Sequence, residues 1–346
     1  MKIIKILTAV ISFCVVFLFL QKLLMPKWLD IPEGNLIREY YNSSKDHDII
    51  FIGDCEVFST FSPVVLWEEF GITSFVRGSA QQLIWQSYYL LRETLTYERP
   101  KVIVLAILAM QYGEPQAEAY NRLTLDGMRM SRHWFNSLRA SMVSGEDIFS
   151  YFLPFFRYKD RWNEINANDF AFIFNRPQVS LNGFLINANT APWSGFSPTP
   201  LPRATYEFGQ MAVDYLNKIT DLAYEYDIPL VLIKAPTIFP TWHDAWNEQI
   251  VLHAERNNLL YVNLLEHDMG LDFTLHTFDA GYTLNVFGAE LVTRFFGEIL
   301  VNEFNLASRK HEPGDWQRKS EIYHRTIEIQ LYELETYGHI NTVLAN

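Results

Sequence analysis

Short apolar runs separated by longer amphipathic segments constrain the fold of this chain more than any other feature. The run KVIVLAIL at 101–108 is apolar on both faces of an extended strand, which is typical of a strand covered from both sides. Similar runs predict strands at 48–52, 72–76, 229–233 and 259–262. Helical spacing is found at 82–97, 206–226, 243–257 and 286–304. Alternating buried strands and helices predict an α/β fold, with a parallel sheet flanked by helices in three layers.

The N-terminal segment, residues 1–26, has the composition of a membrane span. An apolar run extends from Ile6 to Leu20 and is broken only by Thr8 and Ser12. With its apolar flanks it reaches about 20 residues, enough to cross a hydrocarbon core of roughly 30 Å. A cleaved signal peptide is the alternative, but FLFLQKLLMPKW, which ends the run, is bulky throughout and offers no small-x-small site. We therefore expect an uncleaved signal anchor.

Charges flanking this span predict its orientation. Lys2 and Lys5 precede it and favour a cytoplasmic N-terminus, which would place the rest of the chain outside the membrane. Lys22 and Lys27 lie on the far side and oppose that orientation in part. The expected localisation is a cell membrane, with a single pass and an extracytoplasmic domain.

The remainder divides into three expected parts, the second of which contains an insertion. A juxtamembrane linker covers 27–47, and an α/β domain covers 48–304. That domain contains an aromatic-rich insertion at about 111–205, which is too long for an ordinary connection. We expect the insertion to form a subdomain or lid near the carboxyl edge of the sheet. Residues 305–346 have helical spacing and mixed charge, which predicts a surface helix packed on the domain.

Composition excludes several classes of function. The formal net charge of −12 argues against nucleic acid as a partner, because a phosphate-binding surface needs clustered Lys and Arg. The chain has two cysteines, and Cys14 lies in the span, so the exported part would contain no internal disulfide. There is no paired Cys or His at metal-ligand spacing and no Gly-rich phosphate loop. We therefore expect neither a metal nor a cofactor.

The stretch FIGDCEVFS places a lone cysteine directly after the first predicted strand. Ligands of open parallel sheets gather at the carboxyl ends of the strands, where Cys55 would lie. A cysteine in such a turn could act as a nucleophile, although the flanking Asp54 and Glu56 oppose thiolate formation. The ordinary use of a lone cysteine is as a small buried apolar side chain.

Three blocks resemble the SGNH/GDSL hydrolase superfamily. IIFIGDCEVFSTFSP is similar to the first block, where a strand ends in Gly-Asp-Ser, with Cys55 in the place of the nucleophilic serine. VRGSAQQLIWQSYYLL resembles the second block, with Gly78 where a backbone N–H helps bind the oxyanion. FDAGYTLNVFGAELVTRFFGEIL resembles the last block, with Thr283 where the family has its histidine. The asparagine of the third block is not evident, and Gln111 and Asn121 are the polar candidates in range.

This resemblance covers roughly 48–110 and 206–304. With the anchor, the strand LVLIKAPT and the insertion, the chain looks most like an exported, anchored branch of the superfamily. That branch is similar to the D-alanyl-lipoteichoic acid transfer proteins and the proteins of exopolysaccharide O-acetylation. The resemblance implies an acyl-ester hydrolase or O-acyltransferase acting on cell-envelope glycans. By analogy it also implies a membrane-embedded acyl-transfer partner.

The departures from the family pattern leave two hypotheses open. Exchange of serine for cysteine can preserve catalysis, but Thr283 cannot shuttle a proton at neutral pH. Asp279 is the nearest acid, one residue further upstream than the family spacing, and His276 or a substrate group would have to be the base. The positions that could contact substrate are Asp54, Gln111, Asn121 and His243.

The alternative is a catalytically inactive SGNH-like protein that binds glycan or scaffolds the assembly of a surface polymer. A purely structural envelope protein is a third class, which leaves the chemistry of the Cys55 turn unexplained.

Overall fold

The computed structural model describes residues 2–25, 27–28, 31–32, 34–174, 176–195, 205–306 and 314–345. The end of the predicted insertion at 196–204, the start of the tail at 307–313 and a few linker positions lie outside the described residues.

A five-stranded parallel sheet forms the centre of the molecule. Its strands are β3 (Ile49–Gly53), β4 (Ser74–Gly78), β5 (Val102–Ala106), β6 (Leu230–Lys234) and β7 (Leu260–Asn263). They run in the order β4-β3-β5-β6-β7, so the chain turns to opposite sides of β3 when it forms β4 and β5. In such a sheet, the point where the strand order reverses is where ligands bind, at the carboxyl ends. The predicted parallel α/β sheet is confirmed.

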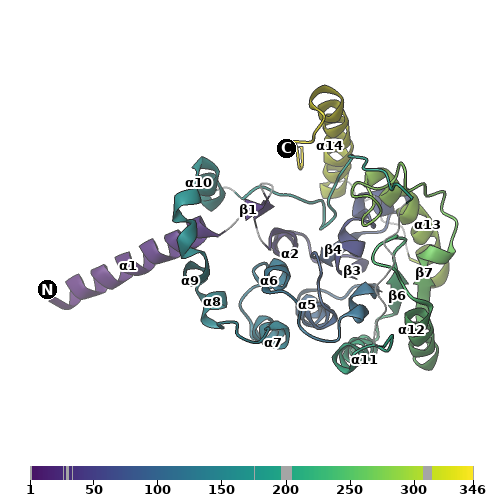
Figure 1. Cartoon of the computed structure of the whole chain (residues 1–346), viewed down its shortest axis with the longest axis horizontal. Helices are drawn as coiled ribbons and strands as arrows, with labels where there is room; N and C mark the ends of the chain where they lie inside the picture. Colours follow the sequence, from purple (N-terminus) through teal and green to yellow (C-terminus); the bar gives the residue numbers. More distant parts are fainter. Residues whose placement is uncertain are drawn as a thin grey trace.

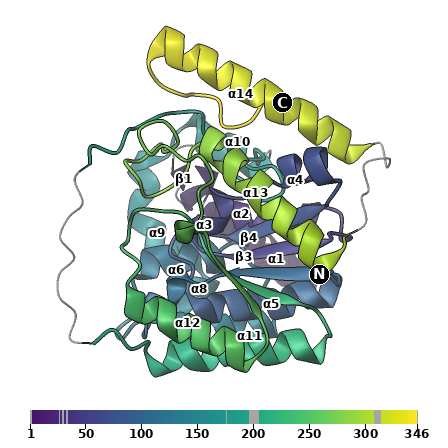
Figure 2. The same cartoon turned by 90° about the vertical axis from the view of Figure 1, so that its right-hand side faces the viewer.

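Helices cover both faces of the sheet (Figure 2). One face carries α5 (Ile84–Tyr97), α11 (Gln210–Glu225) and α12 (Asp244–Arg256), and the other carries α4 (Pro63–Phe70) and α13 (Val286–Phe304). Alternate residues of β5 serve the two cores: Ile103 and Leu105 pack toward the first set, and Val102 and Val104 toward the second. This alternation explains why the strand is apolar throughout, and the three predicted layers are confirmed.

The insertion begins beside α5 and returns across the carboxyl edge. It contains η2 (Leu108–Gln111), α6 (Glu118–Leu125), α7 (Arg132–Ser141), α8 (Phe149–Phe152), α9 (Pro154–Tyr158), η3 (Lys159–Glu164) and α10 (Ala167–Phe174). The returning chain then pairs with the edge strand, since Val76 N donates to Asn182 O at 2.8 Å. Further on, Ala191 N donates to Thr277 O at 2.9 Å, so this part of the insertion contacts a loop at the carboxyl edge.

The two ends of the chain leave the domain in different ways. Helix α1 (Lys2–Leu24) projects from it (Figure 1) and is long and apolar enough to cross a membrane, by length and composition. It is followed by β1 (Lys27–Trp28), β2 (Ile31–Pro32), α2 (Asn35–Glu39) and η1 (Tyr40–Asn42). Helix α14 (Asp315–Tyr337) packs against α4, with Tyr323 fully buried.

A buried polar cluster lies between β4, α5 and the segment after α2; we call it the Arg77 cluster. Arg77 Nη2 lies 3.0 Å from Glu93 Oε2, and His47 Nδ1 lies 2.9 Å from Glu98 Oε2. Tyr40 Oη donates to Glu98 at 2.6 Å. Each carboxylate of this cluster therefore faces its own nitrogen partner, as buried charges require.

Candidate functional site

The Cys55 turn follows β3 at the carboxyl edge of the sheet. Cys55 begins the short helix α3 (Cys55–Phe58), and the Asp54 side chain caps it by accepting from Glu56 N at 3.0 Å. Gly53 pairs with Gly78 in the register of β3 and β4. A Cβ at Gly78 would lie 2.6 Å from Val57 Cγ2 and 3.1 Å from Asp54 O, so only glycine allows this close approach. The structure thus brings the predicted Gly78 directly against the predicted nucleophile turn.

Glu56 is held by a buried lysine that the sequence analysis did not single out. Lys234, the last residue of β6, lies with its Nζ 2.5 Å from Glu56 Oε1 and donates to Ala235 O at 2.7 Å. Thr237 Oγ1 also donates to Glu56 Oε1, at 3.0 Å. Lys234 is fully buried. The available signal was a lysine closing the apolar run LVLIK, because a buried lysine requires a charged partner.

Burial and negative charge at the turn both disfavour the thiolate form of Cys55. Burial, together with the charge of Glu56, raises the pKa of Asp54 to about 7. Burial and the charges of Asp54 and Glu56 raise the pKa of the Cys55 thiol well above its usual value, and Asp279 adds to the effect. A thiolate at neutral pH is therefore disfavoured at this position.

Asp279 and Thr283 face each other in the loop before α13. The Thr283 hydroxyl donates to an Asp279 carboxylate oxygen, and Thr283 N donates to the other at 2.6 Å. Thr277 Oγ1 donates to Thr283 O at 2.8 Å and so fixes the turn. In this structure Asp279 orients a threonine hydroxyl at the position where the resemblance places a histidine.

The loop after β6 joins the Asp279–Thr283 pair to the Cys55 turn. The loop after β6 is tied to the turn through the bonds that Thr237 and Lys234 make with Glu56. The same loop is tied to the Asp279 loop, since Ile238 N donates to Gly281 O at 3.0 Å. In the Asp279 loop, Tyr282 is 52% exposed, and its ring centroid lies 5.1 Å from that of Phe239 in the loop after β6. We call this assembly the Cys55 edge; it comprises Asp54, Cys55, Glu56, Lys234, Thr237, Asp279, Tyr282 and Thr283. It combines carboxylates with an exposed aromatic ring.

The predicted histidines are engaged elsewhere. His276 Nδ1 accepts from Asp272 N at 2.9 Å, a local contact within its own loop. The ring of His243 packs 4.6 Å from the rings of both Tyr206 and Trp246, in an aromatic cluster at the start of α12. Over the part of the chain that the structure describes, no histidine hydrogen-bonds to the Cys55 thiol. Neither histidine is therefore bonded to the Cys55 turn in this structure, and their roles as base and as substrate contact stay predictions.

Of the two candidates for the third-block residue, Asn121 lies away from any surface that a substrate could reach. Asn121 is fully buried, and its side-chain amide donates to Ser141 O at 2.8 Å while Gln86 Nε2 lies 3.4 Å from its oxygen. Asn121 therefore joins α5, α6 and α7 instead of facing a substrate. Gln111 is half-buried at the end of η2, shortly after β5.

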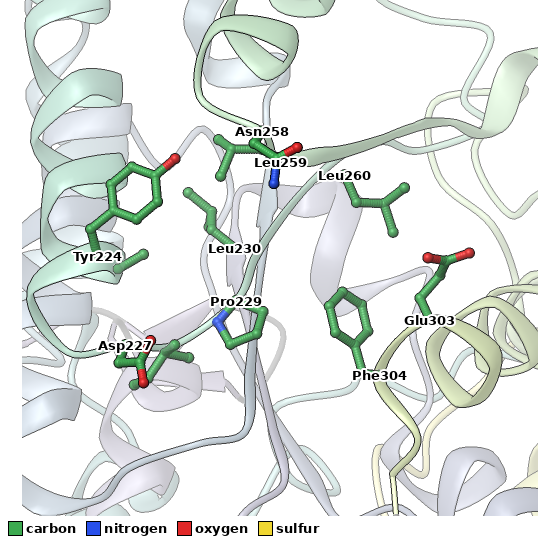
Figure 3. A pocket seen from close by; sticks show the side chains of 11 residues that line it. Tyr224, Asp227, Pro229, Leu230, Asn258, Leu259, Leu260, Glu303 and Phe304 are labelled. Carbon is green, nitrogen blue, oxygen red and sulfur yellow. The ribbon is translucent and has the colours of Figure 1, made fainter.

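A surface hollow occupies the opposite edge of the sheet (Figure 3). Its volume is about 440 Å³. Its lining includes Tyr224 of α11, Pro229 just before β6, Leu230 at the start of β6 and Leu260 in β7. None of the predicted site residues contributes to it. Among the described residues, no group of three or more His, Cys, Asp or Glu side chains is placed to hold a metal ion.

Comparisons with known proteins add little. No family model matches the chain, and no curated protein matches it. Among solved structures, the chain is similar to a protein described as "putative lipolytic protein of G-D-S-L family from Desulfitobacterium hafniense DCB-2". The match has 11% identity and a TM-score of 0.36, and it covers 74% of this chain and 100% of that one. So remote a likeness carries no argument about activity, and the α/β fold rests on the sheet and helices themselves.

Proposed function

We propose that this chain is a membrane-anchored, extracytoplasmic protein of SGNH-like design that binds a cell-envelope glycan at the Cys55 edge without forming an acyl-enzyme at neutral pH. One observation carries the proposal. Burial and the charges of three carboxylates raise the pKa of the Cys55 thiol, and no described histidine bonds to it. A cysteine nucleophile needs a base or a cation to offset such charge.

Two features support glycan as the ligand. The carboxylate of Asp279 and the hydroxyl of Thr283 are groups that exchange hydrogen bonds with sugar hydroxyls. Tyr282, beside them, presents an exposed ring of the kind on which the apolar face of a sugar ring packs. The anchor α1, with Lys2 and Lys5 on the cytoplasmic side, would hold this edge near the envelope surface.

A second candidate function is acyl transfer through Cys55, with a membrane-embedded partner supplying the acyl group. It is favoured by one specific observation, the packing of Gly78 against the Cys55 turn, where its backbone could help bind an oxyanion. In that case a substrate group would have to serve as the base.

One experiment separates the two functions. Full-length protein is treated at pH 7 with iodoacetamide or p-nitrophenyl acetate, and the label is assigned by comparison with Cys55→Ala. We expect Cys55 in the folded protein to be alkylated at least about tenfold more slowly than in urea, because its pKa is raised. A Cys55-dependent burst of p-nitrophenolate near neutral pH would instead support acyl transfer.

Binding is tested with one cell-wall polysaccharide fraction, in O-acetylated and de-acetylated forms. Tyr282→Ala should weaken binding by about tenfold. Tyr332→Ala, which removes an exposed ring on α14, is the matched control and should leave binding unchanged. Equal affinity of Tyr282→Ala and the unmodified protein would contradict the proposed glycan site.

A further inference from the structure

Residues 149–174 of the insertion, which we call the aromatic segment, expose an unusual number of large rings. The segment comprises α8, α9, η3 and α10. Its exposed aromatic side chains are Phe149, Phe152, Phe156, Trp162, Phe170 and Phe174. Trp162 is 71% exposed and Phe174 is 82% exposed. Apolar surface gathered in this way marks a binding surface for a protein or for lipid.

This segment packs against the last turns of the apolar helix α1 (Figure 1). The ring of Phe155 lies 5.6 Å from that of Phe17, and the ring of Phe170 lies 6.5 Å from that of Phe19. Arg161 Nη1 donates to the carbonyl oxygens of Leu24 and Met25, at 3.0 and 2.9 Å. The segment therefore caps the carboxyl end of α1 and contacts its side two turns earlier.

The position of Phe17 along α1 indicates how deep in the membrane the aromatic segment would lie. Phe17 lies five residues before Lys22 and eight before Met25. At 1.5 Å per residue, Phe17 is roughly 8–12 Å below the outer end of the span. A structure that touches Phe17 from the side thus lies at the boundary between headgroups and acyl chains. Interfacial elements are buried to a depth of about 5–10 Å, in agreement with this estimate.

The aromatic segment has no excess positive charge, so its contact with lipid would be apolar. It contains three basic and three acidic residues, so its formal net charge is zero. Two of these charges pair within the segment, since Arg161 Nη2 lies 3.0 Å from Asp169 Oδ1. Arg157 pairs with Glu118 of α6. Attraction to anionic headgroups would need unpaired positive charge, which this segment does not carry in excess.

We propose that the aromatic segment is seated in the outer leaflet beside α1 and binds the lipid surface itself, through apolar contact with neutral lipid. The proposal rests on the anchoring by α1 proposed above. Seated in this way, the domain is held to the bilayer at two points, by the helix and by the segment, and its orientation to the lipid surface is fixed.

The test uses full-length protein in phosphatidylcholine vesicles whose acyl chains carry bromine, which quenches tryptophan fluorescence on contact. The signal of Trp162 is obtained by subtracting the spectrum of Trp162→Phe. We expect bromine to remove about half or more of that signal, as for a ring at interfacial depth. The matched control is Trp316→Phe, on α14, whose difference signal should stay unquenched.

Two further arms separate the outcomes. Replacing part of the lipid by phosphatidylglycerol should leave the quenching of Trp162 unchanged, and a strong increase would overturn seating by apolar contact alone. Protein that floats with the vesicles while Trp162 stays unquenched would refute the proposal and leave the surface to a protein partner. Protein that fails to float would refute the anchor, and with it both proposals.

Discussion

The Arg77 cluster and the Cys55 edge both bury charge, but they balance it differently. In the Arg77 cluster, Glu93 and Glu98 each face a nitrogen partner. Burial raises the pKa of Glu98, but its bonds with His47 and Tyr40 outweigh that effect, and the net pKa lies below the usual value. At the Cys55 edge, Lys234 is the one cation that bonds to Glu56 among the described residues, and the pKa of Asp54 rises to about 7.

The difference in charge balance distinguishes the Arg77 cluster, a structural network, from the Cys55 edge, a candidate site. A balanced cluster stabilises the fold at neutral pH, whereas an excess of buried carboxylate costs stability and persists where it serves binding or chemistry. Each of the four variants below changes the charge of one region, and its effect is compared with that expected in the other.

The largest effect is expected from Lys234→Met. Glu56 would remain buried without its cation, and the free energy of unfolding should fall by about 3–5 kcal/mol. Urea unfolding in detergent at pH 7 measures the loss. The double variant Lys234→Met with Glu56→Gln should recover most of it, because no unpaired charge remains. A loss below about 1 kcal/mol in the single variant would show that the pair is unimportant to folding.

Asp54→Asn should have the next largest effect, with a definite pH dependence. The folded-state pKa of Asp54, about 7, lies above its ordinary value, so the folded state holds this proton more tightly than the unfolded state. Asp54 therefore favours folding at low pH and loses that contribution as the pH rises from about 4 through 7. The amide keeps the helix cap, so the variant should gain on the order of 2 kcal/mol relative to the unmodified protein between pH 5 and 8.

Glu98→Gln in the Arg77 cluster is the control of opposite sign. The pKa of Glu98 is lowered, so its contribution to stability is present above its unfolded pKa and is lost as the pH falls. This variant should lose stability at pH 7 and approach the unmodified protein near pH 3. The same sign of change for both variants would contradict the contrast between the two regions.

The smallest effect is expected from Thr283→His, which adds a titratable nitrogen beside Asp279. Asp279 already bonds the side chain at this position, and it would favour the imidazolium form. A second cation at the edge should lower the pKa of the Cys55 thiol and speed its alkylation at pH 7 by about tenfold. Thr283→Gln, which adds bulk without charge, should not change the rate. An unchanged rate in Thr283→His would mean that this loop position does not reach the thiol.

Most of the fold was predictable because its signals are local. Strands buried on both faces are apolar throughout, as in β5, and all five strands were predicted within two residues of both their ends. Helix α13 begins and ends where predicted, since Asn285 caps it by accepting from Gly288 N at 3.1 Å.

The site was less predictable because its contacts are distant in sequence or depend on loop conformation. Lys234 and Glu56 are 178 residues apart, and nothing local pairs them. His276 was one candidate for the base, beside a substrate group, and Asp272 N, four residues away, donates to its ring in a local turn. Asn121 was named as a polar candidate for the third-block asparagine, but α7 supplies Ser141 O as the acceptor for its side-chain amide.

The return of the insertion past β4 has a consequence for shortening this protein. Asn182 accepts from Val76 N and its side chain donates to Ser74 O, so this residue completes hydrogen bonds at the open edge of the sheet. Gly183, with φ of +85°, packs so closely on Val76 that no side chain would fit. Excising the insertion would uncover that edge, and an uncovered edge strand pairs readily with other chains. What looks in the sequence like a removable addition therefore also protects the domain against aggregation.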